Sequence, residues 1–160
     1  MSDTLISTAQ RRLSMVLYLV GVHSFCVGLG MIAAPEALFV FFGFGATEEL
    51  FFRVQAGVFH MVMVYIYCYG AWRRDVVAIG LSIAAKFTAM LFLLLYYFAY
   101  DAIITVLVSG ILDGAMGLLI LLLYIQTRLN RDDSANSSNQ EANATQPIAP
   151  FTSGKADNSH

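Results

Sequence analysis

The sequence predicts an all-α protein, a four-transmembrane-helix bundle with a short interfacial loop after the first helix and a disordered C-terminal tail. Hydrophobic residues make up 58% of the 160 residues and charged residues only 12%, whereas a soluble domain carries about 25% charged residues. A helix that crosses a membrane needs about 20 apolar residues in a row. Four stretches meet this requirement, at about 13–34, 50–72, 76–100 and 102–127.

These four spans leave no room for a soluble catalytic domain. The chain divides into an N-terminal segment (1–12), a transmembrane domain (13–129) and a polar tail (130–160). The first span follows two arginines and ends in small residues, as a signal peptide would, but its apolar run of about 20 residues exceeds the 7–15 of a signal-peptide core. Pro35 also stands directly after Ala34, where cleavage would fall. We therefore expect a retained helix.

The distribution of arginines predicts the orientation of the spans. Positive residues near span ends favour the cytoplasmic side, and the flanking arginines fall on one side of the predicted bundle: Arg11, Arg12, Arg73, Arg74, Arg128 and Arg131. The acidic residues between spans fall mainly on the other side: Glu36, Glu48, Glu49 and Asp101. We expect a multi-pass protein of the cell membrane with both termini cytoplasmic.

The first outer connection, residues 35–49, reads PEALFVFFGFGATEE. Pro35 ends the first helix, and the aromatic run that follows is too short to span. We expect an interfacial or re-entrant segment that packs over the outer mouth of the bundle; the alternative is an apolar loop lying among lipid headgroups. From residue 130 the composition changes to Asn, Ser, Asp, Gln, Ala and Pro, which predicts disorder.

The two cysteines are not expected to form a disulfide. Cys26 lies past the middle of the first span and Cys68 lies near the cytoplasmic end of the second. At 1.5 Å per residue their depths differ by roughly 13 Å, and bridged Cα atoms usually lie within about 7 Å of each other. Redox chemistry by a thiol pair is therefore disfavoured.

Each span carries one strongly polar residue near its middle. Ionisable groups in the hydrocarbon region are costly, usually face the bundle interior and often serve a function. Counted from the span ends, all four lie within roughly 6 Å of one another in depth. They form a polar layer near the membrane midplane: His23, His60, Lys86 and Asp113.

Lys86 and Asp113 are expected to form an ion pair. The tight connection between the third and fourth spans places them almost level, and either charge buried alone would be orphaned. Gly110 and Gly114 form a small-xxx-small motif that permits close approach of these helices. The pair serves either as a structural clamp that fixes helix register or as part of a functional site, and the sequence leaves both open.

His60 is the residue most suited to a ligand site. Arg53 and Gly57 share its face of the second span, and Gln55 adds a polar group near the outer end. Gly57 is expected to leave room for a ligand above His60, in a small cavity opening outward beneath the Phe39–Phe44 loop. Interior packing of the histidines and an interfacial, outward-reaching Arg53 are the plainer interpretations. The candidate ligand-binding residues are His60, Arg53, Lys86, Asp113, His23 and Gln55.

The order of these features resembles the small four-helix DoxX-like membrane proteins. The resemblance covers roughly residues 13 to 127. It rests on GLGMIAAPEALFVFFGFG at the end of the first span, FFRVQAGVFHMVMVYIY in the second, a Lys-bearing third and SGILDGAMGLLILLLY in the fourth. The resemblance implies the four-helix fold and an association with quinone-dependent oxidoreductase systems, as a membrane subunit beside other chains. The sequence has no thiol pair or cofactor motif, so no catalytic role is carried over.

The leading functional interpretation is an accessory subunit or a protein that binds a small amphipathic ligand, a quinone or lipid, at the polar layer. The alternatives are a membrane isomerase or oxidoreductase using His60, Lys86 and Asp113, a haem electron carrier with His23 and His60 as ligands, and proton-coupled transport. The expected partners are the lipid bilayer and either a membrane subunit or further copies of the chain. The net charge of −2 and the lack of a basic patch away from the span ends disfavour nucleic acid. The sequence identifies no cofactor.

Overall fold

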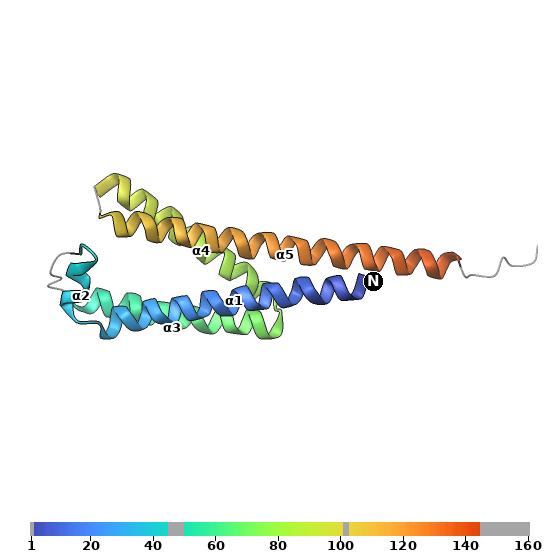
Figure 1. Cartoon of the computed structure of the whole chain (residues 1–160), viewed down its shortest axis with the longest axis horizontal. Helices are drawn as coiled ribbons and strands as arrows, with labels where there is room; N and C mark the ends of the chain where they lie inside the picture. Colours follow the sequence, from blue (N-terminus) through green and yellow to red (C-terminus); the bar gives the residue numbers. More distant parts are fainter. Residues whose placement is uncertain (1, 45–49, 101–102, 145–160) are drawn as a thin grey trace, which may run out of the picture.

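The computed structural model describes residues 2–44, 50–100 and 103–144 and contains five helices (Figure 1). They are α1 (Ser2–Ala33), α2 (Glu36–Phe41), α3 (Leu50–Arg73), α4 (Val76–Tyr100) and α5 (Ile104–Ala144). All but α2 are long and apolar enough to cross a membrane. The predicted all-α fold with four long apolar helices is confirmed.

The four long helices form a ring in which each helix packs against two others. α1 packs along α3 and α4 along α5, and the ring is closed by contacts of α1 with α5 and of α3 with α4. Figure 1 shows α1 and α3 side by side, while α4 runs obliquely away from its turn with α3. We call the end with the N-terminus and the α3–α4 turn the terminal end. The opposite end, where α2 lies, is the loop end.

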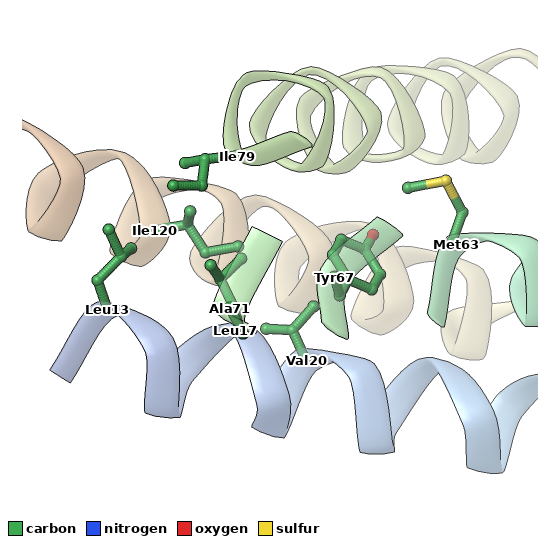
Figure 2. Close-up of a cluster of buried hydrophobic side chains, with 8 residues drawn as sticks. All are labelled: Leu13, Leu17, Val20, Met63, Tyr67, Ala71, Ile79 and Ile120. Carbon is green, nitrogen blue, oxygen red and sulfur yellow. The ribbon is translucent and has the colours of Figure 1, made fainter. Parts of the chain in front are cut away.

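The apolar core lies toward the terminal end (Figure 2). The buried side chains come from all four long helices: Leu13, Leu17, Val20, Met63, Tyr67, Ala71, Ile79 and Ile120. The outward faces are also apolar. Phe51 and Phe98, for example, are 70% and 77% exposed. Because a soluble protein rarely exposes continuous apolar surface, these faces are suited to contact with lipid.

Two glycines bring α1 and α3 into close contact. A Cβ added to Gly28 would lie 2.9 Å from the Gly57 carbonyl oxygen, and one added to Gly57 would lie 2.8 Å from the Gly28 carbonyl oxygen. Side chains at either position would therefore separate the helices. Small residues at helix crossings are a common way to pack membrane helices, where no hydrophobic force drives association.

The predicted close approach of α4 and α5 is confirmed. A Cβ on Gly110 would lie 3.2 Å from the Cβ of Leu93, and one on Gly117 would lie 3.0 Å from the Cβ of Lys86. The small residues of α5 thus let the backbone of Lys86 come near, and they place its side chain beside Asp113.

At the loop end, α2 covers the gap between α1 and α5. Pro35 precedes its first turn, and the Thr105 hydroxyl of α5 donates a 2.7 Å hydrogen bond to the carbonyl of Phe42. Gly43 follows with a φ of 88°, a left-handed conformation that glycine adopts without steric cost. In the part that the structure describes, which ends at Phe44, the segment expected to pack over the mouth of the bundle contacts α5 through this hydrogen bond and lines a cavity with α1 and α5.

Two helices extend further than the sequence indicated. α1 begins at Ser2 rather than near residue 13, and residues 130–144, expected to belong to the tail, continue α5. Once a helix is nucleated, each added residue brings one more backbone hydrogen bond, so polar flanking residues can extend an apolar span. The remaining part of the predicted tail, 145–160, lies outside the described residues.

Both cysteines are free thiols, Cys26 on an exposed face of α1 and Cys68 half-buried in α3. The prediction that they form no disulfide is confirmed.

Candidate functional site

The polar layer is organised around an ion pair between α4 and α5. The Lys86 Nζ donates a hydrogen bond of 2.5 Å to Asp113 Oδ1, and the two side chains are 4% and 14% exposed. Among the described residues this is the one salt bridge. The predicted Lys86–Asp113 contact is confirmed. Since each charge would be costly if left alone away from water, the pairing fixes the register of α4 against α5.

Tyr67 of α3 completes the surroundings of Lys86. The Lys86 Nζ lies 5.7 Å from the centroid of the Tyr67 ring, within the range of a cation–π contact. Tyr67 is 2% exposed, and Ser24 of α1 is buried as well. A chain of contacts therefore links α5, α4 and α3 through Asp113, Lys86 and Tyr67.

A cavity of about 550 Å³ opens beside this ion pair, between α3, α4 and α5. Its polar lining is Gln55, His60, Tyr67, Lys86 and Asp113. The rest of the wall is apolar, including the aromatic side chains Phe52, Phe59 and Phe92. Ligand pockets are typically of about 300–1,000 Å³ and mostly apolar with a few placed polar groups, and this cavity fits that description.

Four of the six candidate ligand-binding residues line this cavity, His60, Lys86, Asp113 and Gln55. His23 and Arg53 do not line it. His23 is exposed on α1. The Cζ of Arg53 lies 4.5 Å from the ring centroid of Phe39, and its buried Nε–H has no hydrogen-bond partner among the described residues. Arg53 therefore contacts the segment over the loop end instead of the cavity.

Two details of the expected cavity were wrong. Gly57 does not leave room for a ligand, because the backbone of Gly28 and the side chain of Ile32 occupy the space beside it. The aromatic segment of α2 does not cover the polar layer. It lines a separate cavity of about 440 Å³, whose wall includes Phe39, Phe42 and Ser109.

Tyr67 borders this site but is not among the candidate residues that the sequence indicates. It lies seven residues after His60 and thus on the same helix face, and that spacing was the available signal.

The ring of lipid-suited helices around a buried ion pair defines a small multi-pass α-helical membrane protein. No family model, curated protein or solved structure matches the chain. The class therefore rests on the four long apolar helices, and the particular function has to be argued from the cavity.

Proposed function

We propose that this protein binds a small amphipathic molecule, a quinone or a lipid, in the cavity between α3, α4 and α5. The observation that carries the proposal is the combination of apolar walls with a buried Lys86–Asp113 pair and His60 at one site. A ligand with a polar head and an apolar tail would place the head near these three residues. Its tail would lie between the phenylalanines and the lipid.

The polar groups suit a carbonyl or hydroxyl head. Lys86 carries three N–H donors, and its contact with Asp113 Oδ1 uses one. A neutral imidazole at His60 can donate one hydrogen bond and accept another. Quinone carbonyls accept hydrogen bonds and quinol hydroxyls donate them, so both redox forms of a quinone match this set.

The DoxX-like resemblance supports the same proposal. It implies a membrane subunit that works beside a quinone-dependent oxidoreductase, and such a subunit would need a quinone site in the membrane. We propose this accessory role in the cell membrane, with both termini cytoplasmic as the arginines indicate.

A membrane enzyme acting on a lipid-like substrate is the second candidate. It is favoured by His60 lying at the same cavity as the Lys86–Asp113 pair, because positioned acid and base groups are what an isomerase or reductase requires. A haem held by His23 and His60 gains no such support, since His23 does not line the cavity.

The proposal is tested by ligand retention in purified protein. The full chain in detergent is incubated with decylubiquinone or with a lysophospholipid, freed of excess ligand, and analysed for bound molecules by mass spectrometry. We expect His60→Ala to lower retention by roughly tenfold, as expected when a buried hydrogen-bonding partner is lost. His23→Ala is the matched control, a histidine in the same polar layer but outside the cavity, and should retain ligand as the unaltered chain does.

A second variant separates loss of the site from loss of the fold. Ala89 lines the cavity, and Ala89→Phe should block it without removing a polar group. Equal retention in His60→Ala, Ala89→Phe and the unaltered chain would refute the proposal. Equal loss in both histidine variants would favour the haem alternative. Conversion of the added molecule to a product of changed mass or redox state would favour the enzyme.

A further inference from the structure

A second polar site lies at the terminal end, away from the cavity of the proposed function. A small cavity of about 40 Å³ is enclosed there by α1, the α3–α4 turn and α5. Three arginines line it: Arg74 from the turn, and Arg128 and Arg131 from α5. We call it the arginine pocket. Its volume suits a compact anion and excludes an acyl chain.

Two of the three arginines are held in place by neighbouring side chains. The Arg74 Nη1 donates a 2.7 Å hydrogen bond to Gln10 Oε1 of α1. The Arg128 Nε donates a 2.9 Å hydrogen bond to the Tyr124 hydroxyl one turn earlier in α5. Each contact uses one of five N–H donors on the guanidinium group, so both residues keep donors for a ligand.

The backbone of Arg74 adds an independent observation. Its φ is 53°, the one positive value among the described non-glycine residues. A left-handed residue directly after a helix is usually glycine, because a Cβ in this conformation is sterically unfavourable. The chain thus places an arginine where glycine would be easier to accommodate, and this arginine lines the pocket.

The pocket has an uncompensated positive charge. Within the described ranges, no carboxylate oxygen lies within 4.0 Å of a nitrogen of these three arginines. The nearby Asp75 instead accepts a 2.8 Å hydrogen bond from the backbone N–H of Ala78 at the start of α4. Three guanidinium groups around one small cavity match the geometry of a phosphate group, which accepts several charge-assisted hydrogen bonds at once.

We propose that the arginine pocket binds the phosphate of an anionic phospholipid headgroup. The lipid is favoured over free phosphate because the pocket lies where apolar helix surface meets the polar end of the bundle. Leu13, Val76 and Ile79 line its apolar side, and Val76 is 48% exposed. Basic pockets between membrane helices near the charged leaflet surface are suited to anionic headgroups. Acyl chains would then extend along α4.

The test compares two variants that remove the same charge. Arg74→Gln with Arg128→Gln removes two pocket arginines. Arg11→Gln with Arg12→Gln removes two arginines of α1 that do not line the pocket. Delipidated full-length chain is titrated with phosphatidylglycerol or phosphatidylcholine, and bound lipid is counted by native mass spectrometry. We expect preferential binding of phosphatidylglycerol, and a loss of roughly tenfold or more in the pocket variant alone.

The competing explanations give different results. Equal loss in both double variants would mean a diffuse attraction to charge and would overturn the proposal, as would equal binding of the two lipids. Displacement of phosphatidylglycerol by millimolar inorganic phosphate, with no lipid preference left, would assign the pocket to free phosphate. If the pocket variant fails to fold, Arg131→Gln and Arg131→Lys decide. The glutamine removes the positive charge and should weaken phosphatidylglycerol binding strongly, whereas the lysine still binds phosphate as a point charge and should weaken it less.

Discussion

At the scale of single residues, the Lys86–Asp113 pair controls the interior of this bundle. The pair is almost completely buried, and Lys86 also lies against the ring of Tyr67. Removing one partner from a buried ion pair is far more harmful than removing both, because the remaining charge loses its only compensation. The same pair borders the proposed ligand cavity, so its structural and functional roles are separable only by comparing stability with ligand retention.

This asymmetry gives a quantitative prediction. Lys86→Met and Asp113→Asn should each lower the free energy of unfolding by about 3–5 kcal/mol, whereas the double variant should lose much less. Denaturant titration in detergent, followed by circular dichroism, measures all four chains of the cycle. Losses that simply add in the double variant would show that the two residues do not stabilise each other.

For single residues, the sequence predicts the depth of a side chain along its helix but not the direction in which the side chain faces. Depth along a helix follows from counting residues. Because the connection between α4 and α5 is short, the depths of Lys86 and Asp113 can be counted from the same end, and their contact was therefore predictable. The rotation of each helix about its axis does not follow from counting. His23 lies on an exposed face of α1, while Tyr67, which is not among the candidate residues, is buried beside Lys86.

At the scale of helices, the α1–α3 crossing depends on two glycines that face each other. The Cβ of an alanine at position 57 would lie 2.6 Å from Ile32 Cγ1 and 2.8 Å from the Gly28 carbonyl oxygen. The first contact is relieved by a side-chain rotation, but the second requires the two backbones to separate. Because His60 follows Gly57 by one turn, such a separation would also shift the cavity wall.

We therefore predict that Gly57→Ala destabilises the protein by about 1–3 kcal/mol, the usual cost of overpacking. Gly80→Ala in α4 is the matched control, because no heavy atom outside its own helix lies within 4 Å of the added Cβ. That variant should be unchanged or stabilised by up to about 1 kcal/mol, because alanine favours the helix more than glycine does. Melting temperatures of both variants in one detergent provide the measurement, and equal shifts would mean that the crossing tolerates separation.

Helix bounds were predictable where the sequence contains a break. Arg74 and Asp75 separate α3 from α4, and both helices have nearly the expected bounds. No such break marks the start of α1 or the end of α5. Their spans were set by how many apolar residues a bilayer requires, whereas the helices continue as long as the backbone hydrogen bonds and side chains allow.

At the scale of the whole molecule, the ring of four helices holds the small arginine pocket at its terminal end and a larger cavity between α3, α4 and α5. Short connections made α3, α4 and α5 predictable neighbours. The position of the cavity was not predictable, because it depends on how α3, α4 and α5 pack around it, and the oblique course of α4 (Figure 1) does not follow from the sequence. The sequence places the cavity beneath the Phe39–Phe44 loop, whereas the cavity of the structure is lined by α3, α4 and α5 and by no residue of that loop.

The orientation of this ring in the membrane is the final prediction. One candidate span precedes residue 45 and three follow it. If all four cross the membrane, residue 45 and the C-terminus must lie on opposite sides. The six arginines flank the terminal end, where the positive-inside rule places the cytoplasm. Alkaline phosphatase fused after residue 45 should be active and should be inactive at the C-terminus, while green fluorescent protein should give the reverse. The same output at both points would refute a bundle of four spans. A complete reversal would keep the four spans, place the arginine pocket on the outer side and contradict the positive-inside assignment.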